Sequence, residues 1–458
     1  MKHEMDKRQR INPRMVAVHT LQDVSREGAY ASIALGRRLR ESGLAQRDKD
    51  LVTEIVYGTL EKKLSLDYLL ERRIEKPNTD NLVRDILRMG AYQIVYLDRI
   101  PDRASVDESV KLARILGREA YVGFINGVLR GIARDKDAGA LGWPDRTENP
   151  VRYLSILHSV PEWLVRRLIH TYGLGEAEQI VSFKPDDRYI TIRRTPDRQS
   201  AETFEAMMTK RGWRYTAGYI PGVYHVTGIG DVGLDRAYLN GEYSVQSESS
   251  MLAAMAVSLK HGGSVLDACA APGGKTACLS EQMAGTGRVY AWDIHEHRVE
   301  LIRNMVKRLR LYNIRPAIRD ATVLREDLRQ TMDAVLIDAP CTGFGVMLNK
   351  PDVKYRQTEE SVLSLAALQR AILNACCTYV KPGGLLVYAT CTLLPEENTG
   401  QVQSFLEAHP EFEPDGAGLR ASLPGFIGDR IDGCMLQLQA YRDMGEGFFI
   451  ARMKRRVG

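Results

Sequence analysis

Apolar residues recur at steps of three and four positions from Asn12 to about Ala138. This spacing places them on one face of a helix, and no strand-like alternation interrupts it. Asn12 and Pro13 are typical of a helix start, and Ser105 with Glu108 has the spacing of a capping box. We therefore expect residues 1–140 to form an all-α domain.

The pattern changes at residues 137–150, where turn-forming residues predominate in the stretch DAGALGWPDRTENP. Residues 151–182 return to helical periodicity. From Tyr189 onward, short β-like runs predict strands at YITIRRT, WRYTAGYI and GVYHVTG, with one helical run, AETFEAMMTKRG, among them. We expect a linker and a small α/β module over residues 141–237.

From about Tyr238 to the end, strand-like runs alternate with helical ones. The strand-like runs are SVLDACA, RVYAWDI, AVLIDAP and GLLVYATC. This alternation is typical of parallel strands joined by right-handed helical crossovers. Residues 238–458 are therefore predicted to form a doubly wound α/β domain, which makes the chain a multidomain protein.

Composition and charge narrow the class of protein. Of 458 residues, 44% are hydrophobic and 26% charged, as in ordinary globular proteins. No run of about eighteen apolar residues predicts a membrane span, and the start, MKHEMDKRQR, lacks the apolar core of a signal peptide. Residues 1–140 hold 26 Lys and Arg against 21 Asp and Glu, and the rest balances at 37 each. A mildly basic N-terminal domain suits a polyanionic partner, although a solvated helical surface accounts for the charge equally well.

The seven cysteines indicate reduced thiols. They form no C-x-x-C pair and no ligand set with histidine, so we expect no metal site. An odd number without a signal peptide favours a cytoplasmic location. Cys278, Cys376 and Cys377 fall in helical runs, where cysteine usually fills the core.

The stretch DACAAPGGKTACLS ends like a phosphate-binding loop, but the first glycine of that pattern is replaced by Cys269. The dinucleotide pattern also fails. What remains is a strand, a tight turn and a helix start, which can bind a polar ligand. Asp293 closes the next strand at the spacing of an acid that accepts two ribose hydroxyls. Asp320, in IRDA, is either a further ligand or a surface turn.

Two more strand ends carry unusual residues. VLIDAPCTGFG places Asp338 just before Cys341, and YATCTLLPEEN places Cys391 between two threonines. Asp338 also fits the magnesium-binding strand of an NTPase, but an adjacent Pro-Cys pair does not. A thiolate can add to carbon 6 of a pyrimidine and activate carbon 5 toward an electrophilic methyl group. A carboxyl at ring nitrogen N3 supports the addition, and release of the thiolate calls for a base.

The motifs DACAAPGGKT, DAPCTGFG and YATCTLLPEEN resemble those of the bacterial Sun/RsmB-type ribosomal-RNA cytosine-5 methyltransferases. TEIVYGTLEKKLSLDYLL and GFINGVLRGIAR resemble the NusB-like RNA-binding domain of that family, and YSVQSESSMLAA the segment before its catalytic domain. The resemblance covers nearly the whole chain. It implies a Rossmann-like methyltransferase domain, S-adenosylmethionine as methyl donor, no metal, and a specific cytosine of 16S rRNA as target.

The resemblance also assigns roles. Cys391 is expected to be the nucleophile, Cys341 to assist product release and Asp338 to hold the cytosine. Lys275 is expected to meet the carboxylate of the donor, Asp293 its ribose and Asp320 its adenine. The full expected donor site is Cys269, Ala270, Ala271, Pro272, Gly273, Gly274, Lys275, Asp293, Asp320 and Asp338.

Three positions depart from the family pattern. Leu348 and Asn349 stand where an arginine pair is usual, and Glu446 where an aspartate is common. Basic residues at 303, 307 and 310, and at 188, 193, 194, 211 and 214, either contact RNA or form solvated surface. Methylation of tRNA and a non-enzymatic role in RNA assembly remain alternatives. We expect a monomer without membrane contact.

Overall fold

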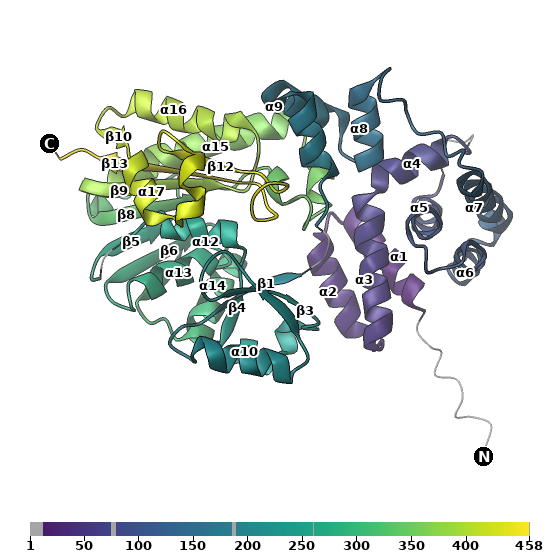
Figure 1. The fold of residues 1–458 in the computed structure, drawn as a ribbon, viewed down its shortest axis with the longest axis horizontal. Helices are drawn as coiled ribbons and strands as arrows, with labels where there is room; N and C mark the ends of the chain where they lie inside the picture. Colours follow the sequence, from purple (N-terminus) through teal and green to yellow (C-terminus); the bar gives the residue numbers. More distant parts are fainter. Residues whose placement is uncertain (1–11, 75–78, 186–188, 260, 458) are drawn as a thin grey trace, which may run out of the picture. The chain divides into compact units, whose positions relative to one another are not determined.

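The structure is a computed structural model that describes residues 12–74, 79–185, 189–259 and 261–457 (Figure 1). The chain divides into two compact units. The helical unit comprises residues 1–182 together with 347–356, and the α/β unit comprises residues 183–346 and 357–458. The N-terminal stretch MKHEMDKRQR and Arg188 lie outside the described residues.

The helical unit buries one shared apolar core, which includes Ile55, Leu66 and Leu87. Its first helix starts as predicted, because Asn12 Oδ1 accepts a hydrogen bond from Arg14 N and a proline follows the cap. The helices are α1 (Pro13–Arg26), α2 (Ala31–Glu41), α3 (Gln46–Glu61), α4 (Lys63–Glu71), α5 (Asn81–Tyr96), α6 (Asp102–Ile115), η1 (Glu119–Tyr121), α7 (Val122–Asp137), α8 (Pro150–His158), α9 (Glu162–Ser182) and η5 (Val353–Tyr355).

The capping box predicted at Ser105 is wrong. Helix α6 begins one turn earlier, at Asp102, with Pro101 at the cap position. Ser105 is buried inside the helix, where its carbonyl accepts a hydrogen bond from Ser109 Oγ. The carboxylate of Asp102 in the first turn favours this earlier start, since it faces the positive end of the helix dipole.

The first part of the α/β unit is a small four-stranded antiparallel sheet in the order β2-β3-β1-β4. Phe204 and Tyr243 lie in its core. Its fourth strand, β4, follows residue 237, where the sequence pattern places the end of this module. The elements are β1 (Ile190–Arg194), α10 (Ala201–Lys210), β2 (Arg214–Ala217), β3 (Val223–Thr227), η2 (Val232–Leu234), α11 (Arg236–Leu239) and β4 (Tyr243–Val245).

The second part is built on a larger sheet, which has nine strands among the described residues. Its strands are β5 (Ser264–Asp267), β6 (Arg288–Asp293), β7 (Ile314–Ile318), β8 (Met332–Asp338), β9 (Val380–Thr390), β10 (Phe412–Pro414), β11 (Ile431–Asp432), β12 (Met435–Leu438) and β13 (Phe448–Arg455). The strands from β7 through β6, β5 and β8 to β9 are parallel, and β13 joins β9 antiparallel.

Helices cover both faces of this sheet, as the predicted doubly wound fold requires. Val265 and Leu336 share one core with residues of α13 and α14, whereas Leu266 and Ile337 share another with residues of α15 and α16 (Figure 1). The remaining elements are α12 (Glu248–Met255), α13 (Gly274–Gln282), α14 (Glu296–Leu309), η3 (Glu326–Leu328), η4 (Phe344–Val346), α15 (Glu359–Cys376), η6 (Cys377–Tyr379), η7 (Pro395–Glu397), α16 (Thr399–Ala408), α17 (Gly416–Ser422) and η8 (Gly425–Arg430).

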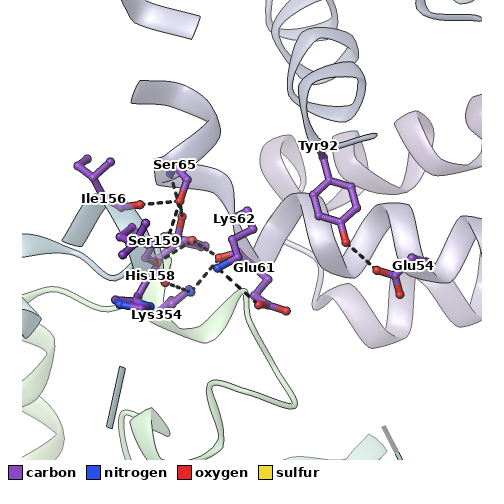
Figure 2. A network of polar contacts seen from close by, with 11 residues as sticks. Glu54, Glu61, Lys62, Ser65, Tyr92, Ile156, His158, Ser159 and Lys354 are labelled. Atoms are coloured by element: carbon purple, nitrogen blue, oxygen red, sulfur yellow. Dashed lines mark hydrogen bonds and ion pairs between the residues drawn. The ribbon is translucent and has the colours of Figure 1, made fainter. Parts of the chain in front are cut away.

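One short segment, Met347–Arg356, belongs to the helical unit although its chain neighbours on both sides belong to the α/β unit. Within it, Lys354 is only 4% exposed, and its Nζ donates to the carbonyls of Glu61 (3.0 Å) and His158 (3.5 Å), as Figure 2 shows. The segment adds further bonds to the same unit: Tyr355 Oη to Ser159 O, Ala31 N to Asp352 Oδ2, and Arg356 Nη1 to Gly28 O. Leu348 and Asn349, which replace the arginine pair of the family pattern, lie in this segment.

Candidate active site

The predicted site residues follow the ends of neighbouring parallel strands. Asp267 ends β5, Asp293 ends β6, Asp338 ends β8, and Cys391 follows β9. From β5 the chain proceeds to β6 and β7 on one side, then returns to β8 and β9 on the other. In doubly wound sheets such a reversal is the usual ligand site, in a crevice at the carboxyl ends of the strands.

The loop between β5 and α13 lines this crevice. Ala270 N donates to the carbonyl of Trp292 (2.7 Å), which ties the loop to the end of β6. Gly273 precedes the helix with φ of 107°, and a Cβ there would lie 2.5 Å from Met305 Cε. Met305 Cε is the end of a flexible side chain and can move, so it is the left-handed φ that favours glycine at this turn. Cys269 packs against the core, and burial raises the pKa of its thiol, so its backbone rather than its sulfur suits ligand binding.

Asp267 is fully buried beneath the loop. Its Oδ2 accepts a hydrogen bond from Thr276 Oγ1 (2.6 Å), whereas Oδ1 has no hydrogen-bond partner among the described residues. Burial raises its pKa to about 7. A buried acceptor without a partner, at the mouth of a strand-end crevice, is suited to a ligand with hydrogen-bond donors or positive charge.

This pKa predicts a pH-dependent stability. Because the folded pKa of Asp267 lies above its ordinary value of 3.8, protonation stabilises the folded state, and this contribution is lost as pH rises toward 7. Asp267→Asn keeps the acceptor for Thr276 but cannot ionise. The unfolding free energy of Asp267→Asn minus that of wild type should increase by about 2–3 kcal/mol between about pH 5 and pH 8. Urea unfolding of the ligand-free proteins measures this. If the unfolding free energies of the two proteins change with pH in parallel, Asp267 is already charged in the folded wild type over this pH range.

Asp293 and Asp320 lie at the ends of adjacent strands. Asp293 is 3% exposed, and its carboxylate meets the backbone N of His295 (3.1 Å) and Nη1 of Arg298 (3.3 Å). Asp320 follows β7, and a hydrogen bond from the Thr322 side chain lowers its pKa. Arg298 was not anticipated from the sequence, since it lies on the following helix and only the fold brings it to Asp293.

Lys275 and Asp338 form an ion pair across the crevice. Lys275 Nζ donates to Asp338 Oδ2 at 2.6 Å and lies 5.3 Å from the centre of the Phe448 ring. Burial acts to lower the pKa of Lys275, but the neighbouring carboxylate raises it overall, so the ammonium stays charged. The partner of Lys275 in this structure is therefore the residue expected to hold the cytosine.

The two candidate catalytic cysteines lie side by side. Their sulfur atoms, Cys341 Sγ and Cys391 Sγ, are 3.4 Å apart, and both residues are partly exposed. The hydrogen bond with Cys391, followed by burial, raises the pKa of the Cys341 thiol well above its ordinary value. Either sulfur can be the donor in this contact, and the raised pKa favours the protonated form of Cys341.

A buried glutamate holds the two cysteine loops together. Glu397 accepts hydrogen bonds from Thr342 N (2.9 Å) and Oγ1 (2.6 Å), from Thr392 Oγ1 (3.2 Å) and from Gln369 Nε2 (3.0 Å). Thr342 follows Cys341 and Thr392 follows Cys391. Burial raises the pKa of Glu397. The sequence carries only a weak signal for this role, namely a pair of acids and an asparagine shortly after an apolar strand.

Two glycines allow the cysteine loops to approach each other. Gly345 N donates to the Cys391 carbonyl (2.9 Å), and Gly447 N donates to the Gly345 carbonyl (2.8 Å). A Cβ on Gly345 would lie 1.9 Å from Gly447 O, which no side chain permits. Next to this contact, Glu446 Oε2 accepts a hydrogen bond from Ser249 Oγ (2.6 Å).

Several basic residues singled out in the small module are occupied within the fold. Arg193 pairs with Glu281, and Arg211 with Asp235 (2.5 Å). Arg194 donates to nearby backbone carbonyls. The remaining positions lie wholly or partly at the surface, namely Arg214, Arg303, Lys307 and Arg310. As predicted, Cys278, Cys376 and Cys377 are buried, and so is Cys434.

Metal ligands and membrane spans have little support in the described residues. No group of three metal-ligating side chains occurs among them. One described stretch, Glu359–Tyr379, is long and apolar enough to cross a bilayer, in contrast to the expectation from the sequence. Because α15 packs on the large sheet and contributes Ile372 and Leu373 to its core, this stretch is equally typical of a core helix.

Two family models match the chain. One, described as the NusB family, covers residues 11–134, and the other, described as 16S rRNA methyltransferase RsmB/F, covers residues 254–454. The fold and the strand-end site thus define a Rossmann-like, S-adenosylmethionine-dependent methyltransferase with a NusB-like helical domain.

Individual relatives agree over the full length. A probable ribosomal RNA small subunit methyltransferase B of Bacillus subtilis is 37% identical, over 97% of this chain and 98% of that protein. A ribosomal RNA small subunit methyltransferase B of Klebsiella pneumoniae is 30% identical, over 97% and 99%. The crystal structure of PH0851 has the same fold, with a TM-score of 0.80 at 24% identity over 97% and 98%. The chain therefore belongs to the ribosomal RNA small subunit methyltransferase B family, which confirms the resemblance seen in its motifs.

Proposed function

We propose that this methyltransferase transfers a methyl group from S-adenosylmethionine to carbon 5 of a cytosine in 16S rRNA, through a covalent bond between Cys391 and carbon 6. The observation that carries the proposal is the pair of sulfur atoms 3.4 Å apart, beside the Lys275–Asp338 ion pair. One thiol can attack while the other serves a different step.

Cys391 is the better nucleophile of the two. The raised pKa of Cys341 favours its protonated form, and its sulfur lies 3.4 Å from the Cys391 sulfur, within reach for a hydrogen bond. A thiolate at Cys391 is stabilised by such a donor. Its addition to carbon 6 makes carbon 5 nucleophilic, and carbon 5 then takes the methyl group.

Asp338 and Lys275 support this addition. As the sulfur adds to carbon 6, negative charge develops toward ring nitrogen N3. A carboxyl at Asp338 would orient the ring at N3, and the Lys275 ammonium bound to it supplies positive charge beside it. Both groups are held by the fold before the RNA arrives.

Cys341 would act after methyl transfer. The first cause of its raised pKa is the hydrogen bond with Cys391, and that interaction changes once the Cys391 sulfur is bonded to carbon. The pKa of Cys341 should then fall. After its own thiol proton has passed to solvent, the Cys341 thiolate can take the proton from carbon 5, and the ring then expels Cys391 as a thiolate and the product is released.

The strand-end crevice fits the methyl donor. S-adenosylmethionine carries two ribose hydroxyls and two positive groups, an ammonium and a sulfonium. The Asp293 carboxylate can accept from both hydroxyls, and the unpartnered Oδ1 of Asp267 offers a buried acceptor to the positive part. When bound, the donor supplies the electrophilic methyl group.

Asp293→Ala should weaken donor binding by roughly 2–4 kcal/mol, because two charge-assisted hydrogen bonds to ribose are lost. Isothermal titration calorimetry with S-adenosylmethionine measures this loss. Asp327→Ala is a matched control, since Asp327 is an exposed acid that pairs with Arg325. Unchanged donor affinity in the Asp293 variant, with a normal unfolding temperature, would contradict the ribose assignment, as would tight binding of ATP.

The site of methylation is tested with RNA that carries tritium at carbon 5 of its cytosines. Methylation at that carbon releases tritium to water, whereas methylation at nitrogen or ribose retains it. Donor-dependent release from 16S rRNA, and not from tRNA, is the expected result. Tritium release from tRNA alone would show that tRNA is the substrate. Donor binding without tritium release from either RNA would indicate a non-enzymatic assembly factor. We also propose that the protein is a monomer and acts in the cytoplasm.

A further inference from the structure

Two large aromatic side chains meet on the surface of the α/β unit. Tyr219 lies in the turn between β2 and β3, and Phe426 lies in η8. Their ring centres are 5.4 Å apart and the planes are tilted by 33°. Tyr219 is 56% exposed and Phe426 is 54% exposed. Two adjacent rings left half in water are typical of a surface that a partner covers.

The hollow beside this aromatic pair is basic. Arg430 and Arg442 line it together with Tyr219, Phe426 and Met444. The only acid among its lining residues is Asp443, which forms an ion pair with Arg430 and lies 3.9 Å from Arg442. Two guanidinium groups against one carboxylate leave an excess positive charge, which suits the phosphate backbone of a nucleic acid.

A short chain segment connects the hollow beside the aromatic pair to the catalytic site. The segment from Arg442 to Gly447 lines the hollow at one end and reaches the cysteine loops at the other, through Gly447 N to Gly345 O (2.8 Å). Fully extended, these residues span at most about 20 Å. A base that lies on the aromatic pair would therefore be close in sequence to the target nucleotide.

A second ring pair flanks the same segment. Tyr189 stacks on His225 with ring centres 4.2 Å apart, and the Tyr189 hydroxyl lies 3.4 Å from the position that a Cβ on Gly445 would occupy. His225 is fixed by Glu248 Oε2 (2.9 Å). Aromatic side chains thus border the 442–447 segment on two sides.

We propose that Tyr219 and Phe426 form a stacking platform for an unpaired base next to the target cytosine, with Arg442 at its phosphate. The proposal rests on the proposed function, because it takes single-stranded RNA as the substrate. Every base presents a π face to such rings, and arginine interleaved with aromatic residues is typical of single-strand binding. A target cytosine that leaves its stack would also separate its neighbours, which a platform can hold.

The test measures binding of fluorescein-labelled oligocytidylate by anisotropy. Tyr219→Ala and Phe426→Ala should each weaken binding about 5- to 150-fold. The KM for RNA should rise, while kcat at saturating RNA stays unchanged. Tyr219→Phe and Phe426→Tyr keep the ring and should bind like wild type. Leu363→Ala removes another exposed apolar side chain, on α15, and should have no effect.

Further variants separate base stacking from apolar contact and from charge attraction. Phe426→Leu keeps an apolar side chain but loses the ring, so it should bind as poorly as Phe426→Ala. An abasic oligomer of equal length should bind wild type and Phe426→Ala equally. Arg442→Gln should reduce the slope of log affinity against log salt by about 0.7.

Wild-type affinity in the alanine variants would overturn the platform, and wild-type affinity in Phe426→Leu would overturn base stacking, because it would show that any apolar side chain binds the oligomer equally well. An unchanged salt slope in Arg442→Gln would remove its phosphate contact. If wild type binds the oligomer but releases no tritium from labelled RNA, the proposed function fails, and the binding measurements still decide whether the platform exists.

Discussion

Cys391→Ala should abolish methyl transfer and form no covalent complex with RNA, whereas Cys341→Ala should accumulate one. Without the Cys391 sulfur no bond to carbon 6 can form, and the rate should fall by roughly 10⁴-fold or more. In Cys341→Ala the attack and the methyl transfer still occur, but the carbon-5 proton has lost the base that lies 3.4 Å from the attacking sulfur. The enzyme should then remain bound to methylated RNA.

Denaturing gel electrophoresis with labelled RNA detects this complex, which should depend on S-adenosylmethionine. The double variant should form none, because attack precedes release. Cys377→Ala is a control of the same residue type, since Cys377 is buried between α15 and β9. A complex in Cys391→Ala but not in Cys341→Ala would exchange the two roles. The absence of a complex in both single variants would remove the covalent mechanism.

Asp338→Asn should lower kcat about 100- to 1000-fold, the usual cost of removing one electrostatic contact to a transition state. The amide keeps the shape of the side chain but not the charge that binds Lys275 at 2.6 Å. Donor affinity should change far less than kcat, because the ribose contact lies with Asp293. Single-turnover methyl transfer and donor calorimetry together measure the two effects.

Asp333→Asn is the matched control for Asp338, since Asp333 is on the same strand, pairs with Lys381 (3.0 Å) and lies away from the carboxyl end of the strand. A kcat for Asp338→Asn within a few fold of wild type would show that the carboxyl does not take part in the addition. A large loss of donor affinity with normal kcat would show that Asp338 contacts the methyl donor and takes no part in the addition to cytosine.

The strand-end residues could be predicted because each lies where a short apolar strand meets a turn. Asp293, Asp338 and Cys391 all lie at the ends of such runs, and parallel strands bring those ends together whatever the details of packing. Motif likeness added the family and the NusB-like character of the helical domain. Local pattern alone was therefore enough for the fold class and for placing the candidate residues at one edge of the sheet.

Features that depend on tertiary partners could not be predicted. Nothing near Glu397 in sequence shows that its carboxylate joins two cysteine loops. Arg193 resembles a surface base in the sequence, yet it is buried against Glu281. The prediction for the start of α6 failed because Ser105 offers a cap in sequence, whereas the helix begins at Asp102 without a side-chain cap and with that acid in its first turn.

The predicted domain of residues 238–458 includes Met347–Arg356, a segment that packs with the helical unit. If residues 1–140 are removed, the buried ammonium of Lys354 loses the carbonyl of Glu61, and Asp352 loses the amide of Ala31. The truncation would therefore disturb Met347–Arg356, which follows Cys341, as well as remove surface available to RNA. Point substitutions in the helical unit separate these effects.

The same segment constrains the order in which the chain is assembled during synthesis. The ribosome finishes helix α9 long before it reaches Lys354, and at about 5–20 residues per second the interval is on the order of ten seconds. During that time the carbonyls of Glu61 and His158 lack the ammonium that later binds them. The helical unit consequently completes its native contacts only after strands β5 to β8 of the large sheet have been translated, so it cannot mature before part of the α/β unit has been made.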